Sequence, residues 1–218
     1  MTNLLNTARE RIEQARDALG IHAATLERYL TDVERLDTTT LEQADLIRGN
    51  QRLALEAKRS DLEAVAATYR QAAEQVTEAT RTVLTDAERT LRAKLELPPL
   101  EGPDAQGRLA NARTDAVLVL DRTTDPDLDT ALETLARDPG DVGHLILTGF
   151  AERYLQARQH NPTAARWAEA RDQLAAERLG PDAQAALERL KGLTPARPVP
   201  EILTHHSHQI AASVEVTG

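Results

Sequence analysis

The sequence predicts an all-α protein, and three observations support that fold class. Hydrophobic residues make up 41% of the 218 residues, but aromatic residues make up only 2%. A core without large rings must be built from Leu, Val and Ala, which favours close-packed helices over a β-sandwich or barrel. Apolar residues also recur at helical spacing, and prolines and glycines separate the helical stretches.

We predict four segments along the chain. Residues 1–96 are expected to form a long antiparallel helical hairpin, packed as a coiled coil, and residues 97–103 a proline-rich linker. Residues 104–192 are expected to form a small helical bundle, and residues 193–218 an extended tail or arm.

The first helix of the hairpin is predicted from a heptad repeat over residues 3–36. Apolar positions seven residues apart, and the positions three residues after each, form one seam: Leu5, Ile12, Leu19, Leu26, Val33 and Ala8, Ala15, His22, Tyr29, Leu36. We interpret the imidazole on this seam, His22, as a tolerated polar layer. Thr39 and Glu42 fit a capping box, which predicts that a second helix starts there.

The second helix is predicted over residues 40–96, about 80 Å long if continuous, against about 50 Å for the first helix. If the chain reverses near residue 38, residues whose numbers sum to about 77 should face one another; several layers of that register fit and three do not. Gly49 and Asn50 fall inside the second helix and predict a kink or a break.

The far end of the second helix carries apolar residues that the first helix cannot reach, including Val83, Leu84, Leu91 and Leu95. At roughly 25 cal/mol per Å² of apolar surface, leaving them exposed would cost several kcal/mol. We therefore expect the downstream domain, a second copy of the chain or another protein to cover them.

The small domain is predicted from helix-start signals. Asp125 before Pro126 and Asn161 before Pro162 mark two helix starts, and Gly180 before Pro181 separates the next two helices. The three aromatic residues in this segment should share one core: Phe150, Tyr154, Trp167. The apolar run at 115–121 fits either a helix, which its spacing favours, or a buried strand paired with 144–149.

The tail is predicted to be extended, because it has three early prolines and no helical period. Its apolar residues could anchor it along a partner: Ile202, Leu203, Ile210, Val214. Three histidines are close enough in sequence to share a metal ion: His205, His206, His208. A mobile tail offers neither a fourth ligand nor a rigid frame, so we interpret them as a polar, pH-sensitive contact.

The sequence offers little catalytic chemistry. There is no cysteine, and the serines Ser60, Ser207 and Ser213 stand in a charged helix and the tail. Asp125, Asp127 and Asp129 alternate as in a calcium loop, but the required glycine and glutamate are missing further on. Single histidines, His144 and His160, are interpreted as capping or surface groups. We predict no catalytic, cofactor-binding or metal-binding residue, and no enzyme; an enzyme on a βαβ unit is the weakest alternative.

The charge of the chain bears on its partners. The formal net charge is −9 at pH 7 and no segment is basic, which disfavours direct binding to nucleic acid. No stretch approaches the roughly 20 apolar residues of a membrane span, and the N-terminus lacks a signal-peptide pattern. We expect a cytoplasmic protein, or a virion protein if the chain is phage-encoded.

Two functions from different classes follow from this architecture. The first is a non-enzymatic assembly protein that forms homo-oligomers or joins other subunits of a multi-copy complex, most concretely a tailed-phage scaffold, minor capsid or connector component. The second is a cytoplasmic adaptor, chaperone-like or regulatory module whose helical groove takes a partner peptide. An exposed apolar groove on residues 103–192, with residues 83–95 packed inside the monomer, would favour the second.

Overall fold

The computed structural model describes residues 4–215, and these residues form helices and loops without any strand. The predicted all-α class is therefore confirmed. The chain folds into two compact units. Unit 1 consists of residues Met1–Thr90 together with Arg189–Gly218, and unit 2 consists of residues Leu91–Glu188.

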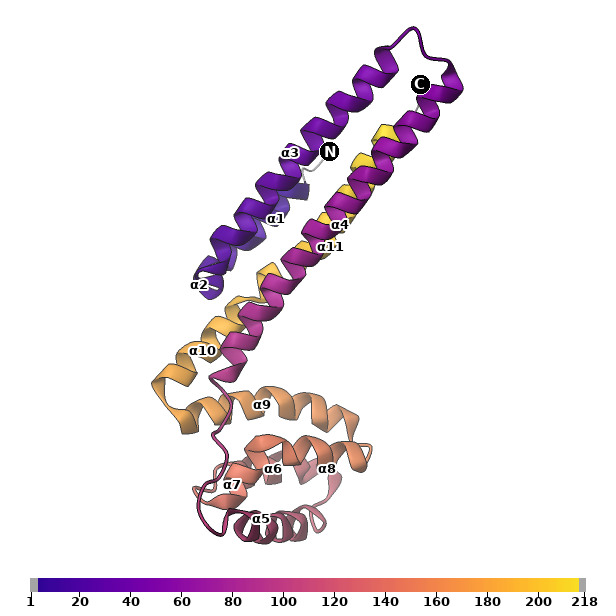
Figure 1. The fold of residues 1–218 in the computed structure, drawn as a ribbon. Coiled ribbons are helices and arrows are strands. Elements are labelled where there is room, and N and C mark those ends of the chain that lie inside the picture. The colour runs from indigo at the N-terminus through magenta and orange to yellow at the C-terminus, as the bar shows by residue number, and fades with distance from the viewer. Residues whose placement is uncertain (1–3, 216–218) are drawn as a thin grey trace. The chain divides into compact units, whose positions relative to one another are not determined.

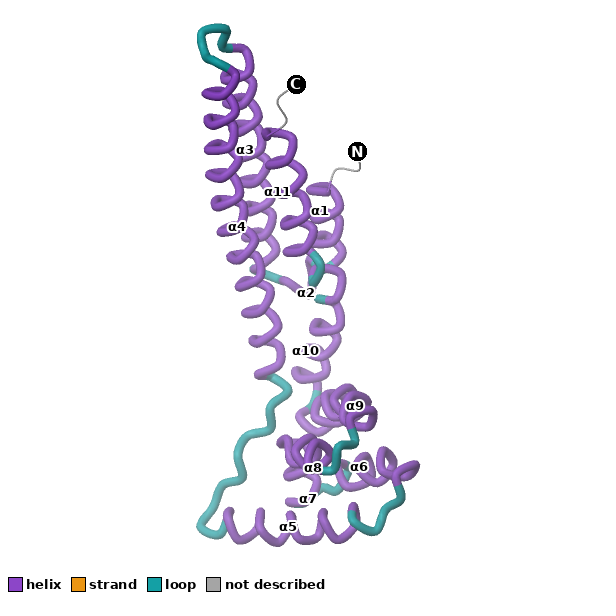
Figure 2. The backbone as a smooth tube through the Cα atoms, turned by 90° about the vertical axis from the view of Figure 1, so that its right-hand side faces the viewer, coloured by secondary structure: helices purple, strands orange, loops and turns teal. Residues whose placement is uncertain are grey.

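Unit 1 is a bundle of helices that run side by side (Figures 1 and 2). Its helices are α1 (Leu4–Gln14), the short α2 (Arg16–Leu19), α3 (His22–Gly49), most of α4 (Leu55–Ala93) and α11 (Val199–Glu215). A 3₁₀ turn, η3 (Thr194–Ala196), precedes α11, and α10 (Pro181–Gly192) spans the boundary between the units.

The predicted turn near residue 38 is wrong, because α3 continues through Thr39 and Glu42. The hydroxyl of Thr39 donates to the Arg35 carbonyl one turn back instead of capping a helix. The chain reverses earlier, at Gly20, whose φ of +56° is in the region that favours glycine. The local capping signal was outweighed by a continuous buried face along α3, and the register predicted from that turn is also wrong.

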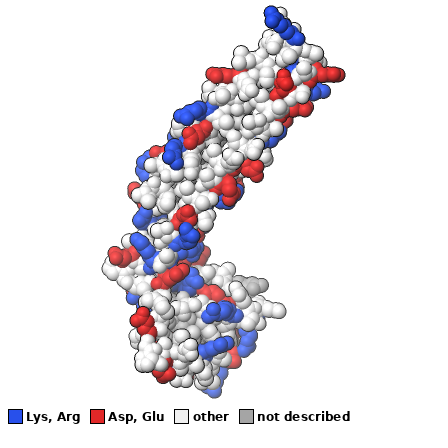
Figure 3. Space-filling view, viewed as in Figure 1, with Lys and Arg blue, Asp and Glu red and all other residues white. Residues whose placement is uncertain are grey.

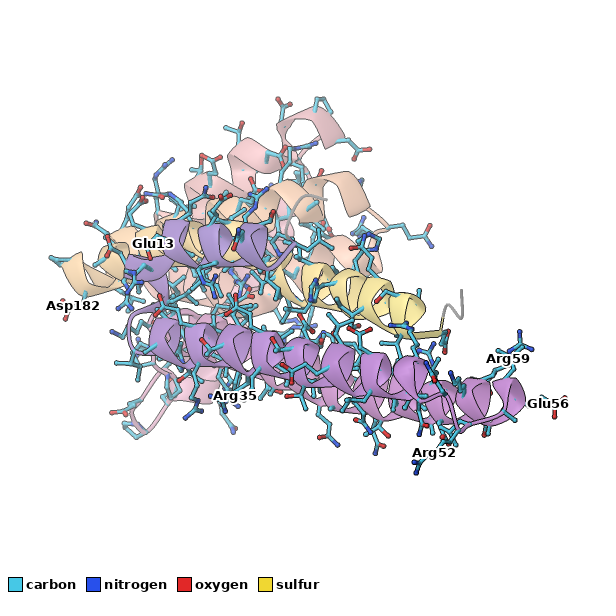
Figure 4. The ribbon with its side chains drawn as sticks, turned by 90° about the horizontal axis from the view of Figure 1, so that it is seen from above. Glu13, Arg35, Arg52, Glu56, Arg59 and Asp182 are labelled. Carbon is cyan, nitrogen blue, oxygen red and sulfur yellow. The ribbon has the colours of Figure 1, made fainter. Side chains whose placement is uncertain are left out.

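The predicted break at Gly49 and Asn50 is confirmed, and it is a full reversal of the chain. Helix α3 ends at Gly49, and α4 starts at Leu55. Between them, the Asn50 side chain accepts a hydrogen bond from the Arg52 backbone N–H at 3.0 Å. Figure 4 shows Arg52, Glu56 and Arg59 extending outward from this end of the hairpin.

The prediction of an extended tail is also wrong, because residues 199–215 form helix α11. Its last proline, Pro200, lies in the first turn of the helix, where the missing N–H costs no hydrogen bond. The helical period is hidden in the sequence because polar residues, His206 and Ser207, occupy buried positions between Leu203 and Ala211. The last three residues of the predicted tail, 216–218, lie outside the described residues.

Helix α11 fills the space beside α3 and α4 with small side chains against larger ones. One cluster joins the three helices near the turn between α3 and α4: Ala44, Leu62, Val65, Ala66, Val214. A second cluster lies along the same helices: Tyr69, Ala73, Ala211, with Leu36 and Ile210 packed against it. The C-terminal helix is therefore part of the core of unit 1.

Unit 2 is a small helical domain. After a non-helical segment at 97–103 come α5 (Ala105–Leu120), η1 (Asp125–Asp127), α6 (Leu128–Ala136), α7 (Asp141–Leu145), the π-helical turn η2 (Ile146–Phe150), α8 (Ala151–Ala157) and α9 (Asn161–Leu179). The predicted starts at Asp125 and Asn161, and the break at Gly180, are confirmed. The run at 115–121 is helical through Leu120, and the predicted aromatic core is confirmed with Phe150, Trp167 and the partly buried Tyr154.

None of the helices within residues 4–215 combines the length and the apolar character that crossing a bilayer requires.

Candidate functional site

A groove between α5 and α8 is the strongest candidate site on unit 2, with a volume of ≈ 640 Å³. Figure 2 shows α5 beside the α7–α8 segment. From α5 the groove is lined by Leu109, Ala110, Arg113 and Val117. From the α7–α8 segment it is lined by Leu145, Phe150, Arg153, Tyr154 and Ala157. We refer to these nine residues as the α5–α8 groove.

The groove has an apolar floor and a basic rim. Leu145 and Phe150 form the floor and are only 8% and 7% exposed. The walls carry partly buried side chains: Leu109, Val117, Tyr154. The rim carries exposed ones: Ala110, Ala157, Arg113, Arg153. A ligand with an apolar surface toward the floor and negative charge toward the basic rim would match this arrangement.

Each wall of the groove is one face of a helix. On α5, Leu109, Arg113 and Val117 are spaced by four, and on α8 Arg153 and Ala157 are also four apart, so each set lies on one helical face, with Ala110 and Tyr154 beside it. The π-helical turn before α8 adds a residue to one turn, which shifts the faces presented by the residues that follow it. Gly149 makes this turn possible, because its φ is +90°.

Two aromatic–cation contacts order the groove. The Arg113 guanidinium carbon lies 5.9 Å from the centre of the Phe150 ring, and the Arg158 guanidinium carbon lies 5.3 Å from that of Tyr154. The two rings are 6.1 Å apart. These contacts hold the rings of Phe150 and Tyr154 beside the groove.

A carboxylate beside the groove, Asp121, already has its partners. Asp121, which follows α5, accepts a hydrogen bond from the Tyr154 hydroxyl at 2.6 Å and pairs with Arg158. Burial of the ring, together with this hydrogen bond to Asp121, raises the pKa of Tyr154 to about 12. Tyr154 therefore stays neutral and fixes one wall of the groove.

The groove itself has no carboxylate among its lining residues. Four other cavities within the described residues each contain at least one: Glu177, Glu96 with Asp172, Glu74 with Glu78, and Asp61. Elsewhere acidic and basic side chains are interspersed, as the face in Figure 3 shows. The α5–α8 groove is thus distinguished by unopposed positive charge.

A second group of polar residues is buried inside unit 1. Asp37 of α3 accepts a hydrogen bond from the Tyr69 hydroxyl of α4 at 2.7 Å, and its other oxygen lies 2.6 Å from Nε2 of His206 of α11. Burial, followed by the hydrogen bond to Asp37, raises the pKa of Tyr69. All three groups are at most 9% exposed, so this triad links helices and is closed to a substrate.

The other predicted histidines do not join this triad. His205 and His208 are exposed on α11, and no group of three or more potential metal ligands occurs among residues 4–215. His144, expected as a capping or surface group, is only 8% exposed; burial, and then the positive charge of Arg178, lowers its pKa. His160 lies 3.6 Å from Asp125 at the start of α9.

Charged side chains also cluster between α8 and α9. Arg171 pairs with Glu152 at 2.8 Å and with Asp172 at 2.6 Å, and Asp172 also pairs with Arg92 at 3.3 Å. The second Glu152 oxygen is buried without a hydrogen-bond partner among the described residues. Because that oxygen has almost no accessible surface, it cannot receive a ligand, and we interpret the cluster as an internal link.

The eight residues predicted to bind a partner lie mostly within the folded chain. Four of them are buried: Leu91, Leu95, Leu203, Val214. The other four are partly buried: Val83, Leu84, Ile202, Ile210. None of the residues that line the groove was predicted from the sequence to be a binding residue. The signal was available, since Leu109 and Val117 flank the more deeply buried Ala112 and Ala116.

No protein-family model, curated protein or solved structure matches this chain.

Proposed function

We propose that this chain is a non-enzymatic interaction protein whose α5–α8 groove binds a helical, apolar segment of a partner protein. The single observation that carries the proposal is the groove itself, with its buried Phe150 and Leu145 floor and its open rim. Aromatic residues and arginine are the side chains that most often dominate the binding energy of protein interfaces.

The dimensions of the groove suit a helix. From Leu109 to Val117 the α5 wall spans nine residues, or about 12 Å, which matches two to three turns of a docked helix. A helix of that length presents apolar anchors at i, i+3 or i+4, and i+7 to such a groove. Arg153, Tyr154 and Ala157 of α8 line the other side of the groove.

This proposal follows the second function derived from the sequence. Its distinguishing features were an apolar groove on residues 103–192 and the packing of residues 83–95 inside the monomer. Of the latter, Ala87, Leu91 and Leu95 are buried. The assembly function, including a tailed-phage component, stays a prediction, and four of the eight residues chosen to carry it are buried.

A peptide selection would test the proposal. Helical peptides displayed on phage would be selected on the full chain and then measured by fluorescence anisotropy against two variants. Ala110→Trp fills the groove from an exposed rim position, and Asn111→Trp puts the same ring on the neighbouring exposed position outside it. Circular dichroism would check that both variants are folded.

We expect selected peptides with an apolar i, i+3/i+4, i+7 pattern whose affinity falls at least about tenfold for Ala110→Trp and is unchanged for Asn111→Trp. Equal binding to both variants, or the absence of any selected helical peptide, would contradict the proposal.

A further inference from the structure

The rim of the α5–α8 groove carries two arginines that the chain leaves without an opposing charge. Arg113 lies in the middle of the α5 wall and Arg153 in the α8 wall. Arg113 contacts the Phe150 ring, and neither arginine forms an ion pair with a carboxylate within residues 4–215. In a chain of net charge −9, many other arginines are paired, as Arg108 is with Asp141 and Arg166 with Asp129.

The position of these arginines defines where a partner's charge must lie. Arg113 comes from α5 and Arg153 from α8, and the Arg113 guanidinium carbon lies 5.9 Å from the centre of the Phe150 ring, so a segment in the groove would meet guanidinium groups from both elements. Guanidinium groups form directional, often bidentate hydrogen bonds with carboxylates. A helix with acidic residues on both sides of its apolar stripe satisfies the floor and both walls at once.

We infer that the partner segment is an acidic amphipathic helix, with its apolar stripe on Phe150 and Leu145 and its flanking carboxylates on Arg113 and Arg153. This inference rests on the proposed function and specifies the chemistry of the partner at the same groove. Because the ion pairs lie at an exposed rim, they add specificity and a faster association rate more than they add affinity.

The probes for the test are three peptides of about 15 residues, stapled to hold the helix and capped at both ends. All carry leucines at i, i+3, i+7 and i+10. The positions flanking the leucine stripe are glutamate in the first peptide, glutamine in the second and lysine in the third. Affinity for the full chain would be measured by fluorescence anisotropy at low and physiological salt.

We expect the glutamate peptide to bind about tenfold more tightly than the glutamine peptide and to weaken as salt is added. The paired variant Arg113→Gln with Arg153→Gln should abolish that difference. Arg122→Gln, an exposed arginine on the loop after α5 and outside the groove, is the matched control and should preserve it. Arg113→Glu with Arg153→Glu should reverse the preference in favour of the lysine peptide.

The outcomes separate this inference from the proposed function. If the three peptides bind equally but Ala110→Trp blocks them all, the acidic partner is wrong and the groove function stands. If the glutamate peptide binds Ala110→Trp as well as the unmodified chain, or if none binds, both are wrong. Tighter binding of dodecanoate than of the glutamate peptide would overturn the inference and indicate that the groove binds a small apolar acid. A self-associated species that Ala110→Trp disperses would overturn it in favour of a second copy of the chain.

Discussion

The two units contain the same chemical pair in two settings. Tyr69 donates to Asp37 deep between α3, α4 and α11, and Tyr154 donates to Asp121 at the end of the α5–α8 groove. In unit 1 the second partner of Asp37 is a buried imidazole, that of His206. In unit 2 the second partner of Asp121 is an exposed guanidinium, that of Arg158. The comparison teaches that burial decides the role: the first pair fixes which helices meet, and the second holds one wall of an open groove.

The largest expected effect is the loss of the buried carboxylate. Asp37→Ala leaves the Tyr69 hydroxyl and His206 without their partner inside the bundle, and we expect it to lower the free energy of unfolding by about 3 kcal/mol. Asp121→Ala, the same change at the exposed pair, should cost less than about 1 kcal/mol because water can replace the carboxylate.

Urea unfolding of the two variants, followed by circular dichroism, would measure both values. Equal losses at the two sites would show that burial does not distinguish the pairs, and the comparison would fail.

Alkaline pH offers a smaller effect with a defined sign. The pKa of Tyr69 is raised in the folded protein, so above its ordinary value of 10.0 the unfolded chain loses a proton that the folded chain keeps. The unfolded state then binds fewer protons, and the free energy of unfolding falls by up to about 1.4 kcal/mol per pH unit for this group. Tyr154 contributes the same loss only until its own pKa of about 12.

Urea unfolding of the unmodified chain, Tyr69→Phe and Tyr154→Phe at about pH 9 and about pH 11 would test this. Each phenylalanine variant should lose less stability between the two pH values than the unmodified chain. An unchanged pH slope in Tyr69→Phe would mean that this phenol titrates normally and is not held by the triad.

The smallest effect concerns the turn that positions the groove. A Cβ at Gly149 would meet only the Glu152 carboxylate at 3.8 Å, so Gly149→Ala creates no clash, but its φ of +90° is unfavourable for alanine. We expect a cost of about 1 kcal/mol, with Gly49→Ala as a control, since Gly49 belongs to α3 and a Cβ there would meet no atom within 4 Å. Thermal unfolding would measure both; an unchanged melting temperature for Gly149→Ala would show that the turn relaxes freely.

Much of unit 2 could be predicted because its helices start and stop at local signals. Asp125, Asn161 and Gly180 stand beside prolines, which restrict the backbone whatever surrounds them. The break at Gly49 and Asn50 was predictable from a different local signal, the low helix propensity of these two residues. By contrast, the capping box at Thr39 is a weak preference, and the buried face of α3 overrode it.

The candidate site could not be predicted residue by residue. Leu109 and Phe150 are 41 positions apart, and the sequence does not record that α5 and the π-helical turn meet. The triad was hidden for a similar reason, because Asp37 and His206 come from opposite ends of the chain and look like surface residues in isolation. Leu91 and Leu95 were expected to be covered, and both are buried. Which part of the chain covers a surface could not be predicted, because it depends on contacts between residues distant in sequence.

The sequence by itself determined the helical class, the positions of several helix ends and the aromatic core of unit 2, since backbone restriction and side-chain size act locally. Only the tertiary structure decided that the C-terminal segment is a helix packed against α3 and α4, and that two arginines line one apolar groove. Both depend on which surfaces meet, and the free energy of burial that selects those contacts belongs to the folded arrangement and not to any single segment.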